Sequence, residues 1–452
     1  MFLKNKFNRR DFMKQGSSSL FSAALGTTLG LSSSGWFPAF ANAATKAATK
    51  TTKKKRSCIL LWMNGGPSTI DLWDVKQGHE NGGPVKEISS ATPGLKYSEY
   101  LPQLAKWSNS LAILRGMSTK EGDHGRGTFI MHTGNTPSGN IDFPSIGSLI
   151  SKELNTDDRT DLPAYISISP FRLFSQEAFN SGFLGPQFNP FFIGSTNNFF
   201  EDQSNADKLL RVDNISPPKE LSADQRQNRL NLLREFEDSF AATHPGRITD
   251  THKLVYEKAN HIMEGLGRKA FDLSCEPEKL RDRYGRTVFG QSCLMARKLV
   301  ETGVPFIEVS LNGWDTHSKN FDAMKRLGGN LDQAWSSLLA DLHDRGLLET
   351  TTILWMGEFG RTPKINQGDG RDHYPAAWAT VLAGGGIRGG QAIGKTSKDG
   401  TSVIERKTSN IDLLATLCKA LEIDYLQSNV SNIGRPIRIV DKSANPVTEV
   451  LL

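Results

Sequence analysis

The stretch VPFIEVSLNGWDTH, residues 304–317, decides the fold, because it joins a buried strand to two potential metal ligands. Its first eight residues are mostly apolar or β-branched, which is typical of a strand in the middle of a parallel sheet. Asp315 and His317 follow directly. Side chains two residues apart in extended backbone point the same way, so both could face one ion. Alternatively, Asp315 caps the following helix and His317 lies at the surface.

A second stretch, TTILWMGEFGRTP (351–363), has the same arrangement. Its apolar run precedes Glu358, and a glycine-rich loop then carries Asp372 and His373. Carboxylates and imidazoles at the ends of parallel strands are how an open α/β sheet builds a metal site at its edge. The alternatives are a buried ion pair between Glu358 and Arg361, and a turn stabilised by Asp372.

Because these clusters all follow strands, we expect them to share one site for one or two divalent ions: zinc, manganese, calcium or magnesium. This requires the imidazoles of His317 and His373 to reach the same ion or ion pair.

The rest of the chain alternates apolar strands with amphipathic helices, which predicts an α/β fold with a mostly parallel central sheet between helices. The further predicted strands are 57–63, 111–114, 164–168 and 378–382, and the predicted helices are 222–240, 287–302, 320–345 and 411–421. We expect one domain over residues 57–440. Within it, residues 170–300 form an irregular and helical insertion or cap.

The first 43 residues are expected to be a signal peptide. NRRDFMK (8–14) is a twin-arginine pattern, an apolar stretch covers 20–31, and ANA (41–43) fits a cleavage site. The apolar stretch is short and rich in Gly and Ser, so we expect no transmembrane span in the mature chain. The sequence thus predicts a periplasmic or secreted protein, exported already folded.

The net charge of +6 comes from the N-terminal end of the chain. Residues 1–56 contain eleven Lys or Arg and one Asp, so residues 57–452 carry a net charge of −4. We expect residues 44–56 to be a basic linker. A slightly acidic folded part argues against nucleic acid as a partner.

A third polar segment, DHGRGTFIMHTG (123–134), starts with Asp123, a suitable cap for a helix. Arg126 could bind an anion through two hydrogen bonds. Both roles are compatible, because helix N-termini attract anions.

Taken together, the chain from Ser57 to about Pro436 resembles a widespread bacterial family that carries a twin-arginine leader, domain of unknown function 1501. The motifs that carry the resemblance are GGPS at 65–68 with Asp71 and Asp74, YG at 284–285 with FGQ at 289–291, GWDTH at 313–317, GEFGRTP at 357–363 and GRDH at 370–373. That family is similar to the alkaline phosphatase and sulfatase superfamily. The resemblance implies an α/β sandwich with a metal centre at the strand ends.

The superfamily places a Ser, Thr or modified Cys nucleophile nine residues before a Thr-Gly pair. Here Thr133 and Gly134 put His124 at that position. A histidine there could form a phosphoenzyme, bind metal or activate water, or it could mean that the usual chemistry is lost.

The superfamily's metal ligands also have counterparts in this sequence. They are Asp315, His317, Glu358 and His373. The Asp that normally ends the first strand is missing, so Asp71 is a second-rank ligand together with Asp372.

Two functions from different classes follow from these residues. The first is an exported metal-dependent hydrolase of phosphate or sulfate esters, in which His124 is nucleophile or general base and Arg126 holds the anion. Its substrate would be a small anionic ester or a sulfated or phosphorylated glycan. The second is a non-catalytic, metal-stabilised binding or assembly protein of the cell envelope, which the missing hydroxyl or thiol nucleophile favours.

Overall fold

A computed structural model describes residues 55–155, 162–194, 205–212, 215, 221–244 and 267–452, together with positions 246, 249, 253, 256, 259–260 and 262–263. Residues 55–452 form one compact unit. The expected signal peptide and nearly all of the expected linker lie outside the described residues.

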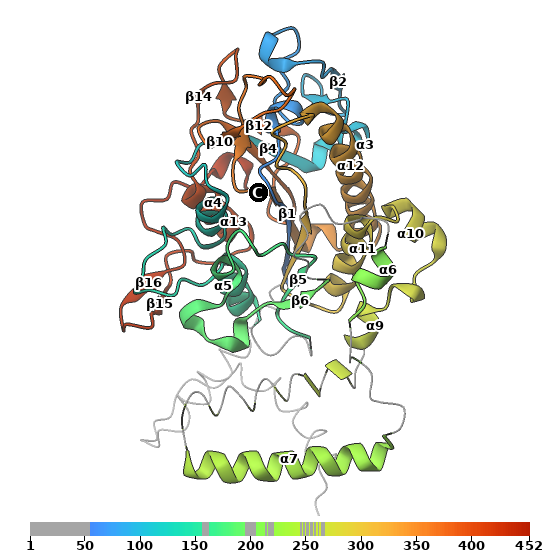
Figure 1. Cartoon of the computed structure of the whole chain (residues 1–452), viewed down its shortest axis with the longest axis vertical. Helices are drawn as coiled ribbons and strands as arrows, with labels where there is room; N and C mark the ends of the chain where they lie inside the picture. Colours follow the sequence, from blue (N-terminus) through green and yellow to red (C-terminus); the bar gives the residue numbers. More distant parts are fainter. Residues whose placement is uncertain are drawn as a thin grey trace, which may run out of the picture. The chain divides into compact units, whose positions relative to one another are not determined.

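An eight-stranded sheet forms the centre of this unit (Figure 1). In spatial order its strands are β12 (Gln391–Ile393), β4 (Leu111–Met117), β11 (Trp378–Gly384), β8 (Thr351–Met356), β1 (Ser57–Met63), β7 (Phe306–Leu311), β5 (Tyr165–Ile168) and β6 (Phe191–Ile193).

Only β11 runs against its neighbours; every other pairing in this sheet is parallel. The mostly parallel α/β fold is therefore confirmed. Strand β1 lies between β7 and β8 and is fully buried, as its continuous apolar sequence requires. The carboxyl ends of β1, β4, β5, β7 and β8 consequently meet at one edge of the sheet.

Helices cover both faces of the sheet (Figure 1). One face packs against α3 (Pro102–Lys106), α11 (Val288–Glu301) and α12 (Asn320–Asp344). The other packs against α4 (His124–Thr133), α5 (Ile146–Leu154) and α13 (Asn410–Ala420). Each strand alternates between these two apolar layers, so both faces are sealed from water.

The predicted insertion contains one long helix and several short elements. They are η4 (Glu177–Phe179), η5 (Gly182–Leu184), η6 (Pro186–Phe188), β6, α6 (Ala206–Leu209), α7 (Ala223–Thr243), α9 (Gly267–Phe271), η7 (Leu273–Cys275) and α10 (Glu278–Tyr284). Helix α7 begins where the sequence predicted, because Ser222 and Gln225 form a reciprocal capping box. The last helix of the predicted insertion, α11, belongs to the core rather than to a cap.

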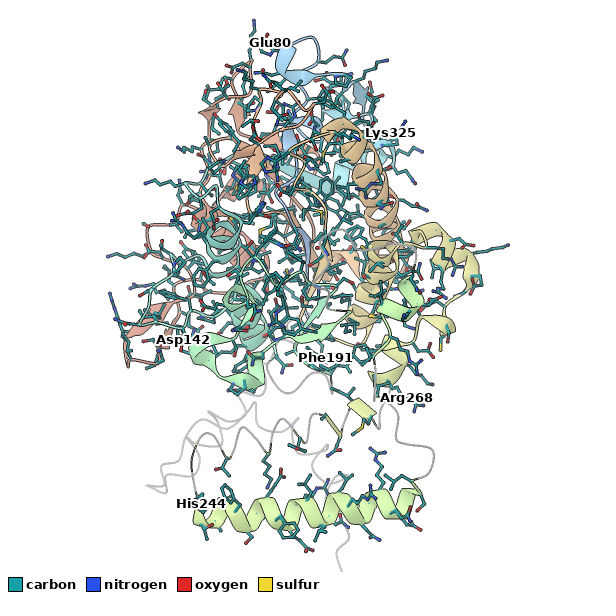
Figure 2. The ribbon with its side chains drawn as sticks, viewed as in Figure 1. Glu80, Asp142, Phe191, His244, Arg268 and Lys325 are labelled. Atoms are coloured by element: carbon teal, nitrogen blue, oxygen red, sulfur yellow. The ribbon has the colours of Figure 1, made fainter. Side chains whose placement is uncertain are left out.

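Short hairpins complete the fold. They are β2 (Glu87–Ser89) with β3 (Lys96–Ser98), β9 (Gly360–Arg361) with β10 (His373–Tyr374), β13 (Lys395–Thr396) with β14 (Val403–Glu405), and β15 (Ser428–Val430) with β16 (Pro436–Arg438). Charged side chains such as Glu80, Asp142 and Lys325 lie on the outside (Figure 2). Among the described residues, no helix is both long and apolar enough to cross a membrane.

Candidate metal centre

Three histidines and one aspartate meet at the carboxyl edge of the sheet. Asp315 and His317 come from the loop after β7, and His373 begins β10. His124 is the first residue of α4, reached from the end of β4. Residues far apart in the sequence therefore meet because their strands are neighbours.

The Nε2 atoms of the three imidazoles surround one carboxylate oxygen. Their distances to Asp315 Oδ1 are 3.0 Å from His317, 3.2 Å from His373 and 3.4 Å from His124. His317 Nε2 also lies 3.0 Å from His373 Nε2. One ligand atom each from His124, Asp315 and His373 lies within 4.8 Å of the other two, which is close enough for a shared ion.

The other ring nitrogen of each histidine is held by an acceptor oxygen. The Nδ1 contacts are His124 to Glu358 Oε1 at 2.7 Å, His317 to Asp372 Oδ1 at 2.8 Å and His373 to the Gly122 carbonyl at 2.7 Å. A carbonyl can only accept, so the Nδ1 of His373 carries the proton and its Nε2 presents a lone pair. Carboxylates favour the same tautomer in the other two rings.

This arrangement leaves electron-rich atoms facing one another. Buried His124 Nε2 and Glu358 Oε2 have no hydrogen-bond partner in the described chain. Lone pairs that converge on a carboxylate repel one another unless protons or a cation lie between them. The donor set thus fits a divalent cation.

The electrostatics of the centre point the same way. Burial by itself would lower the pKa of His124, but the adjacent carboxylates of Asp315 and Glu358 outweigh it and raise that pKa to about 9. Burial would raise the pKa of Asp315, yet the neighbouring His124, His373 and Arg361 side chains hold it well below its ordinary value. The centre therefore attracts positive charge strongly.

Arg361 fixes Asp315 from the inner side. Its buried guanidinium donates to Asp315 Oδ1 at 2.5 Å, to the Gly66 carbonyl at 2.8 Å and to the Gly65 carbonyl. Glu358 does not pair with Arg361. It accepts instead from the Gly65 amide at 2.9 Å and is completely buried beside His124.

The structure places Asp71 in a buried ion pair. Its two carboxylate oxygens accept from Arg371 Nε and Nη2, both at 2.8 Å, and it also accepts from Ser68 and Asn320. Since both oxygens are occupied, Asp71 ties the loop after β1 to the loop before β10.

Arg126 lies at the surface, with 65% of its side chain exposed, and pairs with Glu121 at 2.6 Å. Its backbone amide donates to the Asp123 carboxylate at 2.9 Å, so the predicted helix cap is present.

Aromatic residues that were not among the predicted site residues complete the site. The Phe174 ring stacks on His124 with centroids 4.3 Å apart and planes 7° from parallel, and Phe359 lies 4.6 Å from the His373 ring. A Cβ on Gly125 would lie 2.7 Å from the Phe174 carbonyl oxygen, so glycine lets this loop close on α4. Phe174 lies in a segment without periodicity, and Gly122 acts through its backbone; neither gives a sequence signal.

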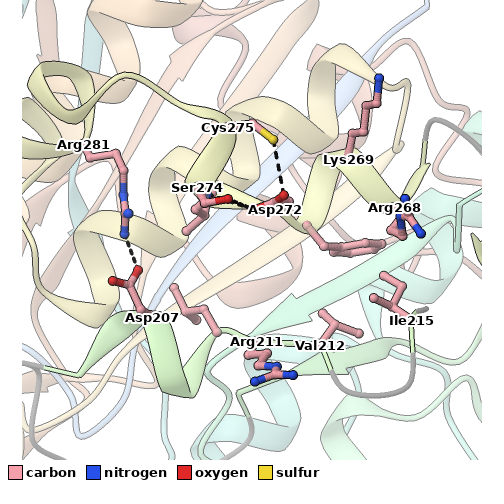
Figure 3. Close-up of a pocket in the computed structure, with 13 residues that line it drawn as sticks. Asp207, Arg211, Val212, Ile215, Arg268, Lys269, Asp272, Ser274, Cys275 and Arg281 are labelled. Atoms are coloured by element: carbon pink, nitrogen blue, oxygen red, sulfur yellow. Dashed lines mark hydrogen bonds and ion pairs between the residues drawn. The ribbon is translucent and has the colours of Figure 1, made fainter. Parts of the chain in front are cut away.

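A separate hollow of about 840 Å³ lies between residues 207–212 with Ile215 on one side and residues 268–281 on the other (Figure 3). None of the predicted site residues lines it. In its wall Arg281 bonds to Asp207, and Cys275 Sγ donates to Asp272 at 3.3 Å. It is therefore distinct from the metal centre.

The chain belongs to the family described as "Protein of unknown function (DUF1501)", whose model matches residues 55–451. A search of curated proteins finds no match.

Several solved structures resemble the chain. The lipoteichoic acid synthase LtaP from Listeria monocytogenes is 9% identical, with 86% of this chain and 75% of that chain covered and a TM-score of 0.40. The PsFucS1 sulfatase from Pseudoalteromonas sp. is 14% identical, with 87% and 72% covered and a TM-score of 0.38. The periplasmic domain of EcEptC from Escherichia coli, in complex with Zn, is 9% identical, with 88% and 92% covered and a TM-score of 0.38. At these TM-scores we draw no functional argument from the likeness.

Proposed function

We propose that this protein is an exported metal-dependent hydrolase of phosphate or sulfate esters. Its ion would be held by His124, Asp315, His317 and His373. The observation that supports this most directly is the convergence of three Nε2 atoms on Asp315 Oδ1, at 3.0–3.4 Å. Export through the twin-arginine route would place the enzyme in the periplasm or outside the cell.

Three nitrogens and one oxygen suit zinc or manganese better than calcium or magnesium, which prefer oxygen ligands throughout. When bound, such an ion would polarise the ester oxygen and lower the pKa of water toward neutrality.

The chain's own carboxylates would prepare the ligands. Glu358 and Asp372 would keep the Nδ1 protons on His124 and His317, which leaves Nε2 free for the ion. His124 has one ring nitrogen against Glu358 and the other facing Asp315. We therefore assign His124 to the ion rather than to nucleophilic attack, and water becomes the nucleophile.

Solvent access supports catalysis over a purely structural role. The side chains of His317 and Asp372 are 47% and 55% exposed, whereas Glu358 is completely buried. A small anionic ester, or a sulfated or phosphorylated glycan, would approach from the exposed side. Arg126 lies two residues beyond His124 and would bind the substrate anion only after leaving Glu121.

The test is metal analysis of the purified protein, with hydrolysis measured on a panel of phosphate and sulfate esters. We expect bound metal and turnover in the wild type, and loss of both in His317→Ala. His343→Ala is the matched control, because His343 is exposed and lies outside the centre. Stoichiometric metal without turnover on any ester would refute the enzymatic proposal.

The second candidate, a non-catalytic envelope protein clamped by the same ion, is favoured by one observation. Position 124, where the superfamily has its nucleophile, carries neither a hydroxyl nor a thiol. Chelation separates the two functions. A structural ion should carry much of the folding free energy, so its removal should collapse the thermal transition. Removal of a catalytic ion should abolish activity but lower the stability of the fold less than removal of a structural ion would.

A further inference from the structure

A second group of polar side chains is buried between α4 and the sheet. Its centre is Glu308 in β7, which is 0% exposed and lies among the apolar residues that α4 and α5 cover. A carboxylate at such a position needs compensating charge, because an isolated buried charge is strongly unfavourable.

The residues next to Glu308 do not supply a positive charge within hydrogen-bonding distance of its carboxylate. The Tyr165 hydroxyl donates to Glu308 Oε2 at 2.6 Å, but it is neutral. His132 Nε2 lies 3.6 Å from the same oxygen. Glu308 Oε1 and His132 Nε2 both lack a hydrogen-bond partner among the described residues.

The geometry of His132 argues against a simple ion pair. Its Nδ1 lies 3.0 Å from the Thr128 carbonyl, which can only accept, so Nδ1 carries a proton. A protonated Nε2 would approach the carboxylate to about 2.7–2.9 Å. A separation of 3.6 Å is instead close to that of two ligands about 2.1 Å from a common cation.

Three buried hydroxyls belong to elements that adjoin or carry Glu308 and His132. Ser167 in β5 is the direct neighbour of Glu308 across the parallel pair, and Ser310 lies two residues further along β7 on the same face. Thr128 precedes His132 by one turn of α4. All three residues are almost completely buried, and their hydroxyls have no hydrogen-bond partner in the described parts of the chain.

We propose that this cluster of buried polar side chains is a second, fully buried site for a divalent cation. The cation would be of the manganese class, which accepts carboxylate, imidazole and hydroxyl ligands. It would neutralise Glu308 and bond to His132, and so clamp α4 to β7. Because α4 also carries His124 at its start, this ion would fix the helix that supports the candidate centre. The inference does not depend on hydrolytic activity.

The test is manganese stoichiometry in Glu308→Gln. We expect one ion per chain fewer than in the wild type, a lower melting temperature, and no further stabilisation by added manganese. Tyr165→Phe is the matched control: it removes only the neutral donor and should keep the ion. His317→Ala should lose the ion of the other centre and keep this one, so failure of either site is recognised separately.

A protein without this cation should give a different result. Without a cation, Glu308→Gln would remove a buried, uncompensated charge, so it should keep the wild-type metal content and melt at the wild-type temperature or above. Should this variant not fold, anomalous scattering from crystals of the manganese-loaded wild type decides. A peak between Glu308 and His132 supports the site, and water alone at that position overturns it.

Discussion

Replacing Glu358 by Gln should weaken metal binding by removing the negative charge that supports His124 as a ligand. Glu358 Oε1 faces His124 Nδ1 at 2.7 Å and accepts from the Gly65 amide at 2.9 Å. In Glu358→Gln, the amide oxygen must keep accepting from the Gly65 amide, because the new NH₂ group and the Gly65 N–H are both donors and cannot bond to each other. The same oxygen still accepts from His124 Nδ1, and the NH₂ group takes the place of Oε2, which has no hydrogen-bond partner in the described chain. The tautomer of His124 is therefore kept, but a neutral amide is a weaker acceptor than a carboxylate and supports the ring less well as a ligand.

Loss of a carboxylate that supports a ligand histidine typically weakens metal binding 10- to 100-fold, equivalent to about 1.4–2.7 kcal/mol. Glu358 is completely buried, so we expect the upper half of that range. Asp372→Asn is the matched comparison on His317. Since Asp372 is largely exposed, water can replace its hydrogen bond, and the loss should be about 2- to 5-fold.

Competition with a chromophoric chelator measures both affinities, and melting of the metal-free proteins shows whether each variant is folded. Equal losses in the two variants, or a Glu358→Gln affinity within about 3-fold of wild type, would contradict the reasoning. In either case the charge of the buried carboxylate would not be what makes His124 a strong ligand.

Three further results are expected. Asp71→Asn should destabilise the protein by about 3–5 kcal/mol in chemical denaturation, because it leaves the Arg371 guanidinium buried and uncompensated, while the folded fraction keeps its metal. In the metal-free protein, the pKa of His124 is raised from 6.5 to about 9, so its stabilisation is complete below pH 6.5 and is lost as pH rises through 9. Melting temperature should fall over that interval, and His124→Ala should flatten the profile. Phe174→Ala should lower metal affinity on the order of 2- to 10-fold by releasing the His124 ring, whereas Phe174→Tyr keeps the stack and the affinity.

The sequence predicted the sheet well, because its central strands are nearly continuous apolar runs. Strands 57–63 and 351–356 were predicted with the observed boundaries. The expected strand 304–311 begins two residues late, at Phe306, after Pro305, which has no amide hydrogen to donate to a sheet. The short edge strands β6 and β12 gain their order from neighbours rather than from their own composition.

The partners of single side chains were less accessible to sequence reasoning. Proximity along the chain suggested that Glu358 pairs with Arg361, but the chain turns between them, and each side chain faces a different group. Arg371, the partner of Asp71, lies 300 residues away in the sequence. Such contacts depend on how the loops after different strands meet, and local patterns carry no information on this.

The gradient of burial across the candidate centre bears on its chemistry. Structural zinc sites are closed by protein ligands, whereas catalytic sites keep a position open to water or substrate. Here Glu358 and Arg361 form a sealed inner wall, while the outer pair, His317 and Asp372, is half exposed. The buried side chains would hold the ligands of such an ion rigidly in place, and water or substrate could reach the ion past the exposed side chains. That asymmetry favours a hydrolytic role over a purely structural clamp, and it makes His317 the ligand whose loss should abolish turnover while disturbing the fold least.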